Sequence, residues 1–163
     1  MRVASGLETP LDSVDRLIKE RNWAHERDND EIKLCVQGQW APYVVTFLWM
    51  PTKHILHLAC GFEFKAPADR VSVVHELLLL VNANLWLGHF DYWPEDDVVL
   101  FRHGMYTGGI QSSEAHCSGA LNDGLEVCDQ FFPAFNGVAQ SGLSAKEALE
   151  AAVCDCEIEG TLQ

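Results

Sequence analysis

Seven histidines and six cysteines are the side chains of this 163-residue sequence best suited to bind a metal ion. His54 and Cys60 are six residues apart, which is about 20 Å along a strand, so they cannot hold the same ion. Cys154 and Cys156 lie close together among acidic residues, but zinc sites usually combine ligand pairs at wider spacing. The pattern favours buried thiols and surface imidazoles, and we expect no metal site and no cofactor.

Nucleophilic and phosphate chemistry also lacks a motif. The sequence contains no Gly-x-Ser-x-Gly, no phosphate-binding loop and no His-Glu-x-x-His. The glycine-rich stretch 104–109 lacks the Lys and Ser/Thr that follow in a phosphate-binding loop, so it is typical of an ordinary connection. The acidic run 95–97 falls in a predicted tight turn, where water keeps carboxylates ionised. We therefore expect no catalytic residues and no enzymatic activity.

Three polar residues stand out by their surroundings. Arg102 is the most isolated base, between Arg70 and Lys146. It either receives a carboxylate from a partner or pairs with an acid of its own surface, and we favour the internal pair. Asn82 and Asn84 follow an apolar run, where they either line a ligand pocket or bond the helix end and the adjoining hairpin. We favour the second alternative.

The hydrophobic pattern predicts the elements that position these side chains. Thr9 and Pro10 are typical of a helix start, and Ser144 with Glu147 forms a predicted capping box. In chain order we expect a helix from Pro10 that ends at Asn22, strands over 31–37, 43–50 and 56–64, a long helix over 67–87, strands over 89–93 and 98–103, a helix from about 113, and a short helix after Ser144.

This order, αβββαββαα, predicts an α+β fold in which helices pack on an antiparallel β-sheet of about five strands. The sheet has more apolar surface than one face needs, because the strand over 43–50 is apolar on both sides. Either the third and fourth helices cover the second face, or a dimer partner or client segment does. We expect Tyr43, Val45, Phe47 and Trp49 to contact the partner. Because both faces of this strand are apolar, the residues on its other face are the alternative contact.

The charge balance excludes some classes of partner. Lys and Arg number 11 and Asp and Glu 24, giving a net charge of −13, which disfavours nucleic acid and anionic membranes. The start of the sequence has no apolar signal region, and the cysteines are scattered through apolar segments as reduced thiols would be. We therefore expect a cytoplasmic protein that forms one domain over residues 1–163.

Several local sequences resemble the YbjN family of bacterial sensory-transduction regulators. They are the stretches 37–40 (QGQW), 82–90 (NANLWLGHF) and 98–102 (VVLFR), and the similarity covers about residues 10–155. The resemblance implies a fold like that of the acidic type III secretion chaperones, which dimerise and hold extended segments of client proteins. It implies no catalytic positions.

The leading hypothesis is therefore a non-enzymatic, dimeric protein-binding domain of chaperone-like or adaptor type. The alternative is a sensor domain that binds a small ligand or a metal between the long helix and the sheet.

Overall fold

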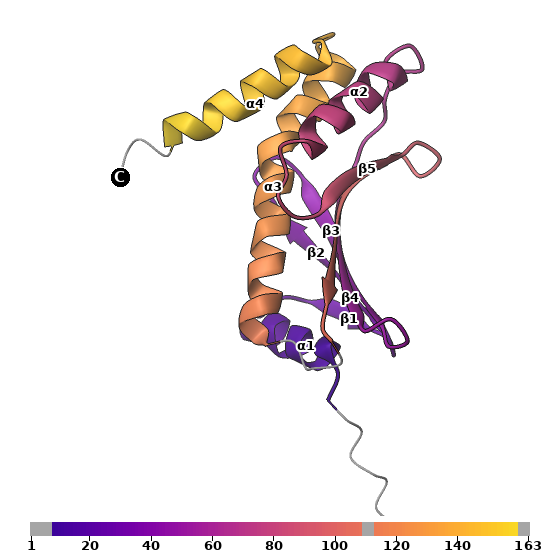
Figure 1. The fold of residues 1–163 in the computed structure, drawn as a ribbon, viewed down its shortest axis with the longest axis vertical. Helices are drawn as coiled ribbons and strands as arrows, with labels where there is room; N and C mark the ends of the chain where they lie inside the picture. The colour runs from indigo at the N-terminus through magenta and orange to yellow at the C-terminus, as the bar shows by residue number, and fades with distance from the viewer. Residues whose placement is uncertain (1–7, 109–112, 160–163) are drawn as a thin grey trace, which may run out of the picture.

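The computed structural model describes residues 8–108 and 113–159, with no account of side chains after residue 154 (Figure 1). The elements are α1 (Pro10–Glu20), β1 (His25–Arg27), β2 (Glu31–Gln37), β3 (Pro42–Met50), β4 (Ile55–Glu63), α2 (Val71–Asn82), β5 (His89–Trp93), β6 (Val98–Tyr106), α3 (Glu114–Gln140) and α4 (Ala145–Glu159). The predicted α+β class and the order of the longer elements are confirmed.

The strands form one antiparallel sheet in the order β1-β2-β3-β4-β6-β5. It has six strands rather than about five because the three residues of β1 pair with β2. That segment, His25-Glu26-Arg27, has no apolar alternation, so its strand conformation comes from pairing with a neighbour rather than from its own sequence.

The predicted capping box at Ser144 is present, and Thr9, predicted to start a helix, forms a second capping box with Asp12. The carboxylate of Asp12 accepts the backbone N–H of Thr9 at 2.6 Å before α1, and the carboxylate of Glu147 accepts that of Ser144 at 2.9 Å before α4. Each bond satisfies a backbone donor at the helix start. Local sequence alone therefore sets where these two helices begin.

The helix α2 is shorter at both ends than the predicted range of 67–87. At its start, Arg70 donates hydrogen bonds to the carbonyls of Val138 and Leu143, which ties the preceding turn to the end of α3. At its end, the Asn82 side chain bonds the backbone of Phe90 and turns the chain into β5. Long-range hydrogen bonds thus end this helix before its apolar pattern does.

The helices share one side of the sheet, where α1 and α3 pack on it directly and α4 lies on α2 and α3 (Figure 1). Of the two alternatives for the second sheet face, coverage by the third and fourth helices is therefore wrong. Those helices bury their apolar residues against the face that α1 also covers, since that side already offers a continuous core.

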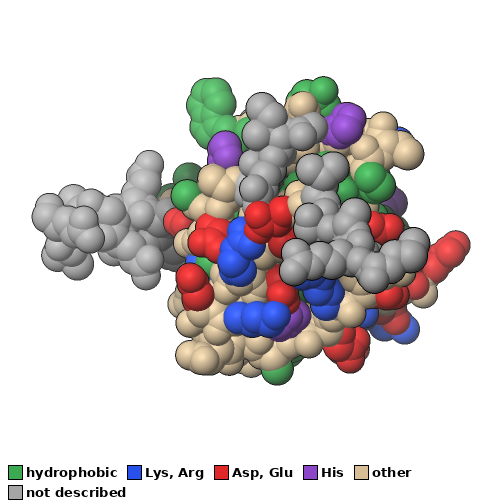
Figure 2. All heavy atoms as spheres, turned by 90° about the horizontal axis from the view of Figure 1, so that it is seen from below, with side chains coloured by type: hydrophobic (Ala, Val, Ile, Leu, Met, Phe, Trp, Pro, Cys, Tyr) green, Lys and Arg blue, Asp and Glu red, His purple; other side chains and the backbone are tan. Residues whose placement is uncertain are grey.

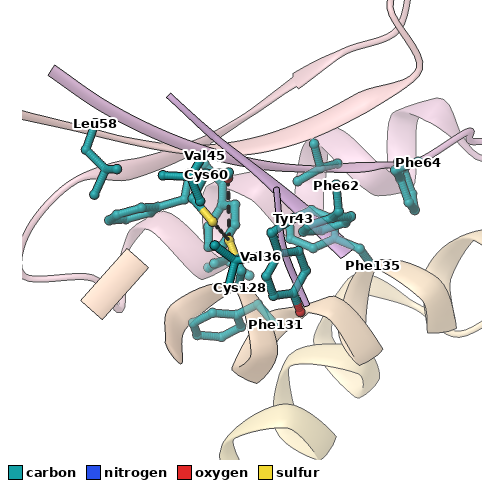
Figure 3. Packing of buried hydrophobic residues seen from close by; sticks show 14 of the residues in the cluster. Val36, Tyr43, Val45, Leu58, Cys60, Phe62, Phe64, Cys128, Phe131 and Phe135 are labelled. Atoms are coloured by element: carbon teal, nitrogen blue, oxygen red, sulfur yellow. Dashed lines mark hydrogen bonds between the residues drawn. The ribbon is translucent and has the colours of Figure 1, made fainter. Parts of the chain in front are cut away.

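Aromatic rings fill the space between the sheet and α3 (Figure 3). The ring of Phe62 lies 6.0 Å from Tyr43, 5.0 Å from Phe132 and 6.1 Å from Phe135, measured between ring centroids. Tilted and edge-on contacts of this kind add to the free energy gained by burial, by about 0.5–1.5 kcal/mol per pair. This cluster fixes α3 across the sheet.

Candidate functional site

The residues predicted to meet a partner lie on the covered side of the sheet. Tyr43, Val45 and Phe47 are 0% exposed, and Trp49 is partly buried against the same core. The prediction that these four side chains contact a partner is corrected, because they already contact the protein's own helices. Both faces of β3 are apolar, so only the packing of the helices decides which one is internal.

The opposite side of the sheet, which no described helix covers, is the first candidate surface, and we call it the open face. Val44 and Trp93 are 46% and 44% exposed there. The cross-strand register brings further apolar side chains onto the same face, namely Leu48, Met50, Ile55, Val98 and Leu100. Apolar side chains in this arrangement can bind another apolar surface.

A shallow hollow of about 380 Å³ lies on the open face around Gly61. A Cβ atom at this position would stand 3.2 Å from Cβ of Leu100 and 3.3 Å from Cγ2 of Val98. The missing side chain thus lets the neighbouring strand pack closely and leaves room above the backbone. The hollow can accept an apolar side chain from a partner.

Arg102 lies on the open face and is paired internally, as predicted. Its Nη1 is 3.0 Å from Oδ2 of Asp91, and its Nε is 3.3 Å from Nε2 of His57. Burial and the charge of Arg102 lower the pKa of His57, so this imidazole is neutral at neutral pH. The Arg102 charge is consequently held by its own surface rather than free for a partner's carboxylate.

The two asparagines bond the backbone, as predicted, rather than forming a ligand pocket. Nδ2 of Asn82 donates to the carbonyl of Phe90 at 3.0 Å, and Oδ1 of Asn82 accepts the Phe90 N–H at 2.7 Å. Nδ2 of Asn84 donates to the carbonyl of Leu80 at 2.8 Å. Neither side chain therefore points a free amide at a ligand under α2.

The stretch Gln37–Trp40 anchors the turn between β2 and β3 to α3. Oδ1 of Asp129 accepts the backbone N–H of Gln39 at 2.7 Å and the hydroxyl of Tyr43 at 2.5 Å. The indole N–H of Trp40 donates to the Asp129 carbonyl at 3.0 Å. These bonds explain why a polar turn is held against a long helix, and the role of the stretch is structural.

The described cysteines are free thiols, and three of them, Cys60, Cys117 and Cys128, are buried. The contact with Cys60, Sγ to Sγ 3.5 Å, and burial raise the pKa of Cys128 well above its usual value (Figure 3). Cys154 is exposed, and the side chain of Cys156 lies outside the described part of the chain. Within that part, no three His, Cys, Asp or Glu residues are grouped as metal ligands would be.

The glycine-rich stretch belongs to β6 up to Tyr106, and Gly109 lies outside the described residues. The acidic run forms the turn between β5 and β6, where Asp97 pairs with Lys65 at 3.1 Å. Neither feature gathers groups for catalysis. None of the described helices combines the length and the apolar character needed to cross a membrane.

Charged side chains gather at the end of the molecule formed by α1. Figure 2 views this end and shows Lys and Arg interleaved with Asp and Glu. Arg16 pairs with Glu8 and with Glu114, and Arg27 pairs with Asp12. Because opposite charges satisfy one another here, this end offers no surplus charge to a ligand.

A second candidate surface was missed by the sequence analysis. Trp86 is 96% exposed and Leu87 63% exposed, in the loop between α2 and β5. The sequence places Trp86 and Leu87 in the predicted long helix, where an apolar residue is expected to be buried. Only the early end of α2 exposes them.

Comparisons with known proteins bear on the fold and the family. The family model YbjN, described as "Putative bacterial sensory transduction regulator", matches residues 10–137. A solved structure described as "Crystal structure of YbjN, a putative transcription regulator from E. coli" has a similar fold, with a TM-score of 0.54 and 11% sequence identity over 95% of this chain and 97% of that chain. No curated protein matches the sequence.

Proposed function

This chain belongs to the YbjN family, whose members are described as bacterial sensory-transduction regulators, and from that premise we propose a non-enzymatic regulatory protein that binds another polypeptide and acts as a homodimer. The whole chain would form one domain with its core at about residues 10–155. Its thiols fit a reducing compartment, and the proposal therefore includes a cytoplasmic location.

The observation that carries the proposal is the uncovered open face. A helix-free apolar sheet face of this kind normally marks a surface that another polypeptide covers. The hollow around Gly61, next to exposed Val44, gives the centre of the face a shape into which a side chain can pack. These features support binding rather than catalysis, since most side chains that line the hollow are apolar and its acidic residues are Glu63, Asp96 and Asp97, the last paired with Lys65.

The charges of the open face favour a second copy of the chain as the dimer partner. Basic Lys33 and Arg102 offset part of the acidic charge on this face, which comes from Glu26, Glu31, Glu63 and Asp91 and, at the hollow, from Asp96 and Asp97. The chain as a whole carries −13, so most of its surface repels a copy of itself. The open face offsets part of its own acidic charge and carries the apolar side chains around Val44, which suits a two-fold symmetric contact.

The test is the solution mass of the wild type and of Val44→Glu. We expect the wild type to have twice the 18.2 kDa of one chain, and Val44→Glu to be a folded monomer because the new charge would be buried in the contact. Leu79→Glu is the matched control, since Leu79 is 75% exposed on α2, away from the open face. A monomeric wild type, or a Val44→Glu dimer, would contradict the proposal.

A further inference from the structure

A groove runs along the first half of α3, on the helix side of the sheet. Two adjoining hollows of about 540 and 330 Å³ form it, and both are lined by Leu87, His103, Ala120 and Asp123. The first hollow extends beside the end of β6, and the second extends beside the loop that carries Trp86. The groove is therefore built from three separate parts of the chain.

One wall of the groove is an unpaired strand edge. β5 pairs with β6 from Val98 to Arg102, while β6 continues to Tyr106. Beyond Arg102, no described strand lies on the β5 side of β6. Such an edge presents backbone N–H and C=O groups to which an extended segment can add as a further strand.

The length of the groove suits a short extended segment. Its lining runs along α3 from Ala115 to Gln130, which is about 22 Å at the rise of an α-helix. An extended chain covers this distance with about seven residues. Small residues of α3 keep the groove open, and a Cβ atom built on Gly119 meets nothing within 4 Å.

The apolar side chains of the groove are placed as binding anchors. Trp86 and Leu87 are 96% and 63% exposed, so Trp86 has an almost free aromatic surface at the groove. Aromatic residues of this kind often contribute most of the binding free energy of an interface. The exposed Leu87 lies between the two hollows.

The charge of the groove selects the occupant. Asp123 and Glu126 line it, and neither forms an ion pair with any described Lys or Arg. Among the residues that the structure describes, no Lys or Arg lines either hollow. A second copy of this acidic chain would add repulsion there, whereas a basic side chain would neutralise the carboxylates and stack on Trp86.

We propose that this groove binds an extended segment of a partner polypeptide in which basic residues alternate with apolar ones, as a strand added to the free end of β6. The inference rests on the proposed function and assigns its client-binding site and the chemistry of the client. It also separates two surfaces, with the open face for the second copy and the groove for the client.

The test is an array of random-sequence heptapeptides probed with labelled full-length protein. We expect the bound peptides to be enriched in Lys and Arg alternating with apolar residues. Gly119→Leu puts a side chain into the groove at a position where a Cβ atom meets nothing within 4 Å, and Trp86→Ala removes an anchor. Each should weaken binding of the best peptide about tenfold, measured by fluorescence anisotropy. Leu79→Ala removes an exposed apolar side chain outside the groove and should bind as the wild type does.

Other outcomes overturn the inference. Bound peptides without enrichment in Lys and Arg, or equal binding by wild type, Gly119→Leu and Trp86→Ala, would remove the groove as the client site. A changed solution mass of Gly119→Leu would show that a second copy occupies it. Val44→Glu should still bind the peptide. Failure of the dimer proposal and failure of the groove proposal can therefore be told apart.

Discussion

At the scale of single residues, the carboxylate of Asp15 contacts three cationic or potentially cationic side chains. Its carboxylate is 2.6 Å from Nζ of Lys19, 3.2 Å from Nη1 of Arg27 and 2.7 Å from Nε2 of His25. Burial by itself would raise the pKa of Asp15, but the hydrogen bonds from Lys19 and His25 and the charges of Lys19 and Arg27 hold it below the usual 3.8. The ionised form therefore stabilises the folded state.

The stability of the protein should depend on pH through this carboxylate. A lowered folded-state pKa gives stability that is complete above the unfolded value of 3.8 and is lost as the pH falls through the folded value. We expect Asp15→Asn to lower the free energy of unfolding by about 2 kcal/mol near neutral pH and by much less at about pH 2. Urea denaturation at both pH values measures this.

The control for this prediction is Asp69→Asn, because Asp69 is exposed and forms no ion pair among the described residues. It should change the free energy of unfolding little at either pH. An Asp15→Asn difference that is equally large in acid and at neutral pH would show that the Asn side chain disturbs packing rather than charge.

At the scale of elements, α3 contains a proline close to the point where the turn between β2 and β3 packs against it. Pro133 has no N–H, so it cannot donate to the carbonyl of Asp129, four residues earlier. The indole of Trp40 donates to that carbonyl instead, at 3.0 Å. The carbonyl that Pro133 leaves without a helix hydrogen bond is therefore the one to which the turn between β2 and β3 is bonded.

A double-mutant cycle tests this coupling. Trp40→Phe should lower the free energy of unfolding by about 1 kcal/mol, because it removes the donor to the Asp129 carbonyl. In the Pro133→Ala background the same substitution should cost less, since the backbone N–H gained at this position restores the helix bond. Equal costs of Trp40→Phe in both backgrounds, measured by chemical denaturation, would contradict the coupling.

At the scale of the whole molecule, the two candidate surfaces differ in charge. The open face mixes basic and acidic side chains, while the groove carries the carboxylates of Asp123 and Glu126, which pair with no described Lys or Arg, within a chain of net charge −13. Salt screens both the general repulsion between two acidic copies and the attraction for a basic segment. The two binding events should therefore respond to salt in opposite ways.

Raising the salt concentration from about 0.05 M to about 0.5 M should strengthen the dimer and weaken the binding of a basic heptapeptide. Sedimentation equilibrium measures the first and fluorescence anisotropy the second. Asp123→Asn combined with Glu126→Gln should reduce the salt dependence of peptide binding and leave that of the dimer unchanged. Peptide binding that salt does not affect would contradict the electrostatic part of the groove proposal.

The sequence predicted most elements because their signals are local. The capping boxes at Thr9 and Ser144 and the alternation over 31–37 act within a few residues of the chain. The same rules failed for β1 and for the end of α2, which depend on β2 and on the Asn82 bonds to Phe90. Each depends on a specific partner outside the element itself, and such a pairing leaves no apolar periodicity in the element to detect.

By itself the sequence determined the α+β class, the family resemblance, the internal use of Arg102 and Asn82, and a surplus of apolar sheet surface. Only the tertiary structure decided which face of β3 is buried. It also decided that Trp86 lies outside a helix and beside a strand edge. The reason is that hydrophobic burial has no direction of its own. Two equally apolar faces become inside and outside only when α1 and α3 pack on one of them.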